Sequence, residues 1–171
     1  TDSLVATGTA AVDIGLKSFS TASGIEQIVN ATSNGSVVRL LGDWSANTLD
    51  FSSVSFVGGN FLLDGAEGND TIKGTSLADR IRGGRDADSL DGRDGSDVYE
   101  VTGAGPDWVS GVPYTFQGYD SYTDSGSAAD TDSLVATGTA AVDIGLKSFS
   151  TASGIEQIVN ATSNGSVVRL L

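Results

Sequence analysis

Short apolar segments recur through the first part of the chain, positions 1–64, at intervals of about 9–13 positions. Residues 12–16 alternate apolar side chains with polar or small ones, which is typical of a strand that buries one face. Further short strands are expected at 25–29 and 36–41, and apolar positions continue through 49–56. Ser, Thr, Gly and Val dominate and are weak helix formers, so only 46–50 is expected to form a short helical turn. The pattern predicts an all-β segment.

Residues 65–100 follow a stricter pattern of four consecutive nine-residue blocks without a gap. Each block opens with Gly, has Asp at its sixth position and has an apolar or aromatic residue at its eighth. A fixed period of this kind predicts a solenoid in which each block supplies a six-residue turn and a three-residue strand. The three sets of positions are Gly65, Gly74, Gly83 and Gly92; Asp70, Asp79, Asp88 and Asp97; and Ile72, Ile81, Leu90 and Tyr99.

The spacing of the aspartates predicts a metal site. Two blocks make one coil, so turns two blocks apart are expected to stack, with Asp70 over Asp88 and Asp79 over Asp97. Glycine permits the backbone angles of such a turn, and the bent turn directs backbone carbonyls toward the carboxylates. Calcium takes about six to eight oxygen ligands of these two kinds. The predicted cofactor is therefore Ca²⁺.

This segment resembles the calcium-binding nonapeptides of the RTX (repeats-in-toxin) family of secreted bacterial proteins. The resemblance covers only positions 65–100 and implies one calcium site for each pair of stacked turns. For the first site it implies the carboxylates of Asp70 and Asp88 and the carbonyls of Gly65, Glu67, Gly84 and Asp86. For the second site it implies the carboxylates of Asp79 and Asp97 and the carbonyls of Gly74, Ser76, Arg93 and Gly95.

The blocks depart from the family pattern at five turn positions. Ala66, Thr75 and Arg93 replace the second glycine of their blocks, and Leu77 and Asp86 replace the glycine at the fourth position. At Leu77 a residue with a bulky side chain would have to adopt a turn conformation that favours glycine. The alternative to a β-roll is a disordered Gly/Asp-rich linker. The four in-register apolar positions argue against such a linker. Without calcium we expect disorder, because stacked carboxylates repel and three-residue strands bury little.

A long duplication frames the chain, since the segments 1–41 and 131–171 are identical. Identity at every position of so long a segment exceeds what a shared fold requires, so it indicates recent duplication and a tandem array. We therefore divide the chain into one full unit, 1–130, and the start of the next unit, 131–171. The absence of Met, including at position 1, leads us to expect an excerpt of a longer protein.

Within the unit, residues 1–64 are predicted to form an irregular solenoid that continues into the β-roll at 65–100. The expected fold class is an all-β, right-handed parallel β-solenoid with an RTX section. Residues 101–130 differ, because they hold both prolines and five of the twelve aromatic side chains. They are predicted to form a loop packed by its own aromatics before the chain returns to the solenoid. The alternative is a carbohydrate- or protein-binding patch within 106–122.

Composition excludes several classes of function. The chain has no Cys and no His, which removes disulfides, thiolate metal sites and His-dependent catalysis. Its net charge of −13 disfavours nucleic acid and anionic membranes as partners. No apolar run approaches the roughly 20 residues of a membrane span, so membrane insertion is not expected. The chain is predicted not to be an enzyme.

The resulting hypothesis is a calcium-dependent structural repeat of a secreted or cell-surface bacterial protein, such as an adhesin stalk, a fibre or a surface layer. Extracellular calcium would fold and stiffen it, and its partners would be calcium and the neighbouring identical repeats. One alternative is a module that binds surface carbohydrate or protein through the 106–122 aromatics. Another is a non-catalytic module of a polysaccharide-modifying enzyme.

Overall fold

The computed structural model describes residues 1–102, 116–127, 129–163 and 165–171, and in these ranges the chain is a stack of short parallel strands. Every strand pair in the described ranges is parallel. The described residues contain no α-helix; their helical elements are two 3₁₀ turns, Thr21–Ser23 and Thr151–Ser153. The predicted all-β parallel solenoid is confirmed. None of the described helical turns is long and apolar enough to cross a membrane.

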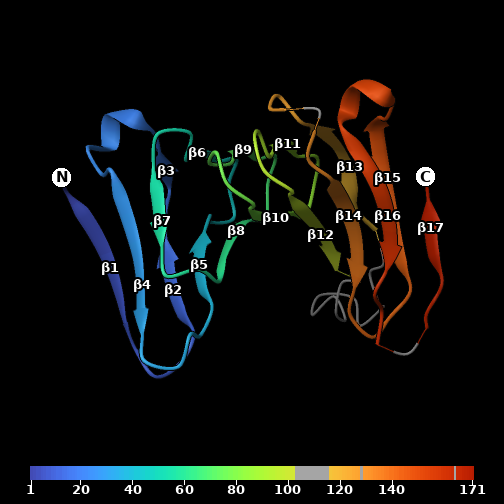
Figure 1. Ribbon diagram of the computed structural model, residues 1–171. Helices are drawn as coiled ribbons and strands as arrows, with labels where there is room; N and C mark the ends of the chain where they lie inside the picture. Colours follow the sequence, from blue (N-terminus) through green and yellow to red (C-terminus); the bar gives the residue numbers. More distant parts are fainter. Residues whose placement is uncertain (103–115, 128, 164) are drawn as a thin grey trace.

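The strands form three sheets, and the two ends of the chain lie at opposite ends of the stack (Figure 1). The first sheet contains β1 (Ser3–Gly8), β4 (Gln27–Thr32) and β7 (Ser55–Val57). The second contains β2 (Val12–Gly15), β5 (Val38–Leu41), β8 (Phe61–Ala66), β10 (Arg80–Gly84), β12 (Val98–Thr102), β14 (Asp132–Thr137) and β16 (Ile155–Asn160). The third contains β3 (Ser18–Phe19), β6 (Thr48–Asp50), β9 (Thr71–Lys73), β11 (Ser89–Asp91), β13 (Phe116–Thr123), β15 (Val142–Ser148) and β17 (Val168–Leu170).

The number of strands in each coil changes along the stack. In the N-terminal part each coil uses all three sheets, and Ser3 pairs with Gln27 of the next coil. After β7 the first sheet ends, and each coil has one strand in the second sheet and one in the third. In this narrower part Thr71 pairs with Ser89, which lies two nonapeptides further on, as the period predicts. In the nonapeptide coils the narrowing follows from coil length, because two nonapeptides leave no room for a third strand.

Two ladders of inward side chains form the core of the stack. In each ladder, residues in register on successive strands are almost completely buried, so every coil buries its apolar side chain against the next. The eighth-position residues of the nonapeptides form the middle of both ladders. The ladder of the second sheet is Leu40, Leu63, Ile81, Tyr99 and Leu134, and that of the third is Leu49, Ile72, Leu90 and Tyr122. Phe19, Phe51, Phe56 and Phe61 fill the wider N-terminal coils, with neighbouring rings in contact.

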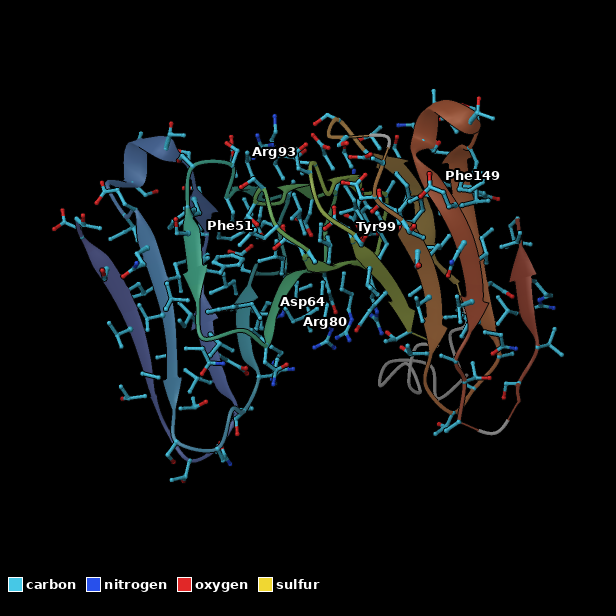
Figure 2. All side chains as sticks on the ribbon, in the orientation of Figure 1. Phe51, Asp64, Arg80, Arg93, Tyr99 and Phe149 are labelled. Atoms are coloured by element: carbon cyan, nitrogen blue, oxygen red, sulfur yellow. The ribbon has the colours of Figure 1, made fainter. Side chains whose placement is uncertain are left out.

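Ion pairs on the second sheet connect three successive coils. Arg82 on β10 pairs with Asp64 on β8 at 3.2 Å and with Glu100 on β12 at 2.8 Å. Arg80 adds a second pair to Glu100 at 2.6 Å. Arg80 and Asp64 lie on the opposite side of the stack from Arg93, which is in the turn after β11 (Figure 2). These acidic groups are therefore already neutralised by arginine.

Three segments differ from the sequence prediction. Strand β1 has no clear alternation and was not expected, yet it pairs with β4 along its whole length. Residues 48–50, expected in a helical turn, form β6 because they stack on β9. Residues 116–123, expected in a loop, form β13 between β11 and β15. Residues 101–102 of the predicted aromatic loop belong to β12, and residues 103–115 lie outside the described residues.

Candidate metal centre

The predicted stacking of the nonapeptide aspartates is confirmed by direct hydrogen bonds between coils. The backbone N–H of Asp70 donates to Oδ1 of Asp88 at 2.8 Å, and that of Asp79 donates to Oδ1 of Asp97 at 2.8 Å. Each bond joins residues 18 positions apart. The turns therefore form two columns in which the carboxylates of Asp88 and Asp97 lie directly beside the backbone of the preceding turn.

The second oxygen of most of these carboxylates is buried and unpaired. Within the described part of the chain, Oδ2 of Asp70, Asp88 and Asp97 has no hydrogen-bond partner and almost no solvent exposure. An ionised carboxylate that is removed from water without a counter-charge is strongly unfavourable. The turns therefore hold negatively charged oxygens in a position that favours a bound cation.

The pKa values of these carboxylates agree with this view. Burial, followed by the charge of neighbouring aspartates, raises the pKa of Asp70 to about 7 and that of Asp88 to about 8. Burial and the charges of Asp79 and Asp132 raise the pKa of Asp97 to about 8. In the metal-free chain these groups ionise only around or above neutral pH. A proton or a metal ion is therefore needed to balance the buried charge.

The block-opening glycines leave space beside the carboxylates. A Cβ on Gly65 would lie 2.3 Å from Oδ2 of Asp70 and 2.4 Å from the carbonyl oxygen of Gly83. A Cβ on Gly92 would lie 2.0 Å from Oδ2 of Asp97. Any side chain at these positions would fill the space next to the unpaired oxygen. The residues present therefore fit calcium, whose coordination needs carboxylate and carbonyl oxygens together.

Three of the four turns share one backbone conformation. Their second and fourth residues have positive φ, which non-glycine residues rarely adopt. This conformation turns successive peptide groups toward the same concavity. The residues are Ala66 and Gly68 (φ 80° and 102°), Gly84 and Asp86 (113° and 76°), and Arg93 and Gly95 (73° and 116°).

The turn 74–79 is built differently. Neither Thr75 nor Leu77 has positive φ, so Leu77 does not adopt the strained conformation that the sequence pattern suggested. Instead, the backbone N–H and the hydroxyl of Thr75 both donate to Oδ2 of Asp79, at 2.6 and 3.0 Å. Burial still raises the pKa of Asp79 to about 6. The Asp79 carboxylate is therefore stabilised by its own turn and has less capacity left for a cation.

The predicted ligand carbonyls all belong to these four turns. No point in the described ranges gathers three or more Asp, Glu, His or Cys side chains around a possible metal position. A cation here would thus take most of its ligands from backbone oxygens. The carbonyls of Gly65, Glu67, Gly84, Asp86, Gly74, Ser76, Arg93 and Gly95 stay predicted ligands.

Both columns extend beyond the residues predicted from the sequence. Asp120 accepts the backbone N–H of Asp88 at 3.0 Å, and Asp132 accepts that of Asp97 at 2.8 Å. A sequence signal for both exists, because each lies two positions before a core residue, Tyr122 or Leu134, as in the nonapeptides. The missing glycines and the longer spacing hide this signal.

The aromatic residues of the predicted loop do not share one environment. Tyr122 is buried and its ring meets that of Tyr99 edge-on at 5.5 Å. Tyr119, on the same strand, is half exposed. Trp108 and Tyr114 lie outside the described residues. Tyr122 is therefore a core residue and is not available to a carbohydrate or protein ligand.

Comparison with known families agrees with the geometry of the turns. The family model of the RTX calcium-binding nonapeptide repeat matches residues 63–99 in 4 copies. Residues 63–99 are RTX repeats. RTX nonapeptides bind calcium ions, so this part of the chain is a calcium-binding repeat module. No curated protein and no solved structure matches the chain.

Proposed function

We propose that this chain is a calcium-dependent structural repeat of a secreted or cell-surface bacterial protein, such as an adhesin stalk, a fibre or a surface layer. The observation that carries the proposal is the column of stacked aspartates with buried, unpaired oxygens at Asp70, Asp88 and Asp97. Such a column is unfavourable while empty and favourable once cations neutralise it. Folding of the RTX section is therefore linked to calcium.

This linkage gives the repeat a switch between two environments. Extracellular calcium modules typically bind in the range of about 10⁻⁴–10⁻³ M. At low calcium the carboxylates repel, and the short strands β9 and β11, three residues each, bury too little to hold the coils together. The open chain suits export, and calcium outside the cell then folds and stiffens the section.

The tandem duplication supports a role in a long stack. Strand β14 begins the second copy of the repeated segment, and it pairs with β12 of the RTX section from Val98 to Thr102. The next unit thus continues the stack without a break, and each coil covers the edge of its neighbour. We propose neighbouring identical repeats as the main partners, and we propose no catalytic role.

A calcium titration of this chain tests the proposed function. As calcium rises to millimolar concentrations, circular dichroism should show a gain of β-structure. Small-angle X-ray scattering should show that the disordered chain becomes smaller and takes the shape of a short rod. Magnesium at equal concentration is the control, because it demands a tighter octahedral geometry. If chelated and calcium-loaded samples gave the same spectra and scattering, the proposal would be wrong.

A binding role for the 106–122 aromatics is the second candidate. It is supported by the half-exposed Tyr119 and weakened by the burial of Tyr122. Replacing Trp108 and Tyr114 by Ala should abolish binding to surface carbohydrate or protein while calcium-induced folding persists. Unchanged binding by this double variant would exclude these two aromatics as the binding surface.

A further inference from the structure

The column of Asp79 and Asp97 continues into the second copy of the repeated segment. Oδ1 of Asp132 accepts the backbone N–H of Asp97 at 2.8 Å, as Oδ1 of Asp97 accepts that of Asp79. Asp132 is only 1% exposed, and its Oδ2 is buried without a partner among the described residues. Asp132 therefore repeats the geometry of a nonapeptide aspartate, although it lies well beyond the matched repeats, which end at position 99.

The backbone around Asp132 also stacks on the last RTX turn. A Cβ on Gly126 would lie 2.2 Å from the carbonyl carbon of Arg93, as a Cβ on Gly84 would lie close to the carbonyl of Ala66. Both pairs place a glycine over the second residue of the preceding turn. The close approach leaves no room for a side chain at either glycine.

A second contact follows the same rule. The N–H of Gly95 donates to Oδ2 of Asp130 at 2.8 Å, as that of Gly68 donates to Oδ2 of Asp86 at 3.2 Å. Gly126, Asp130 and Asp132 thus occupy the second, fourth and sixth positions of an RTX-like turn. The chain between Gly126 and Asp130 is longer than the single residue that a nonapeptide has there. The insertion hides the turn from a period-based search.

We infer that a calcium ion binds between the turn 92–97 and the turn that contains Gly126, Asp130 and Asp132. The carboxylates of Asp97 and Asp132 supply charged oxygens, and backbone carbonyls of the two turns complete the coordination. This inference rests on the proposed calcium dependence but adds a site outside the RTX nonapeptides. The corresponding position in the other column is less suited, because Oδ2 of Asp120 already accepts the hydroxyl of Tyr122 at 3.0 Å.

The site joins two units of the tandem array. Asp132 is the second residue of the repeated segment and corresponds to Asp2 of the first copy. Both have the same local bond, from their N–H to Glu26 Oε2 at 2.6 Å or to Glu156 Oε2 at 2.7 Å. Only Asp132 stacks on an RTX turn, whereas Asp2 is exposed. The ion therefore ties the RTX section of one unit to the first strand of the next.

The pair Asp132→Asn and Asp2→Asn tests this site with a matched control. The Asn keeps an oxygen for the N–H of Asp97 but removes the charge. Native mass spectrometry at saturating calcium should count one ion fewer in Asp132→Asn than in the wild type, and Asp2→Asn should bind the wild-type number. An Asp132→Asn variant that retains the wild-type number would overturn the inference.

Anomalous diffraction from wild-type crystals grown with terbium gives a direct second test, which holds even where Asp132→Asn fails to fold. The site requires a peak at about 2.3–2.6 Å from carboxylate oxygens of both Asp97 and Asp132. Peaks confined to the stacked nonapeptide turns would reject this site and keep the proposed function. A chain that binds no calcium or terbium at all would reject both.

Discussion

Residues 1–41 and 131–171 have the same sequence and sit at opposite ends of the stack, so they separate local from tertiary effects (Figure 1). Their internal pairing is the same. Ser3 pairs with Gln27 as Ser133 pairs with Gln157, and Val12 pairs with Val38 as Val142 pairs with Val168. Both copies also form the same 3₁₀ turn with a capping box. Local sequence therefore determines how two coils pair.

The two copies bury different coils. In the first copy the second coil is the more buried, and in the second copy the first coil is the more buried. Ile28 and Leu40 are 0% exposed in the first copy, whereas their equivalents Ile158 and Leu170 are 43% and 51% exposed. Leu4 is only partly buried, whereas its equivalent Leu134 is fully buried beneath β12. Phe19 is buried because its ring stacks on Phe51 of the next coil, whereas its equivalent Phe149, labelled in Figure 2, is exposed. The same residue stabilises the stack only where a neighbouring coil covers it.

The RTX section links the two copies. Ionisation of its aspartates is therefore expected to have the largest effect on the difference in burial between them. In metal-free protein the pKa values of Asp70, Asp88 and Asp97, at about 7 to 8, exceed their ordinary value of 3.8. The folded chain then holds these protons more tightly than the unfolded chain, so the stability that these three groups contribute is fullest below about pH 4 and is lost as pH rises through 7 to 8. Thermal melts in chelator should show a lower Tm at pH 8 than at pH 5.5.

Calcium-loaded protein is the control for this titration, because calcium replaces the protons and should abolish most of the loss at pH 8. Hydrogen exchange at Leu134 in metal-free protein at pH 8 should approach that at Leu4, since β14 then loses the cover of β12. A metal-free Tm that rises from pH 5.5 to pH 8 would contradict the buried-carboxylate explanation.

Truncation of equivalent leucines should show the next largest difference. Leu40→Ala creates a cavity in the core and should cost about 2–4 kcal/mol of unfolding free energy in calcium-loaded protein. Leu170→Ala removes a half-exposed side chain and should cost less than about 1 kcal/mol. Denaturant unfolding of both variants measures the difference. Equal costs would mean that burial in the stack does not determine the contribution of this position.

Removal of one carboxylate tests how the stability of the RTX section, which lies between the two copies, depends on calcium. Asp88→Asn removes a buried charge, so it should stabilise the metal-free chain at pH 8 and destabilise the calcium-loaded chain. The calcium midpoint should rise about tenfold, which corresponds to about 1.4 kcal/mol. Circular dichroism with chelator measures the expected stabilisation of the metal-free chain, and calcium titrations measure the expected destabilisation of the calcium-loaded chain.

Asp79→Asn is the matched variant for Asp88→Asn. Oδ2 of Asp79 already accepts two hydrogen bonds from Thr75, so its removal should shift the calcium midpoint less than Asp88→Asn does. A larger shift for Asp79→Asn would show that the turn 74–79 rearranges when calcium binds.

The smallest expected difference concerns one ion pair that occurs in both copies. Arg39 pairs with Asp13 at 2.5 Å and Arg169 pairs with Asp143 at 2.5 Å, but the Asp13 side chain is 44% exposed and that of Asp143 is 9% exposed. Arg169→Ala should destabilise its coil more than Arg39→Ala does, because it leaves a buried carboxylate without its partner. Hydrogen exchange of the terminal coils compares the two losses. A greater loss in Arg39→Ala would contradict this explanation.

Much of the central site was predictable because its period is regular. The coil of two nonapeptides, the stacking of Asp70 on Asp88 and the inward ladder through Ile72 and Leu90 all follow from the repeat. The extension of the columns to Asp120 and Asp132 was not predicted. Their carboxylates accept backbone N–H groups of the roll at sequence separations of 32 and 35, which differ from the 18-residue spacing of the nonapeptide coils.

The short-range features of this protein follow from local sequence: parallel coils, calcium-type turns and the pairing inside each copy of the repeated segment. Long-range stacking of coils, in contrast, settles which identical residues are buried and brings Asp132 to the end of a column begun by the preceding unit. The physical reason is that a turn is set by the angles of a few consecutive residues. Burial, in contrast, depends on the coil stacked above, which can be far away in the chain.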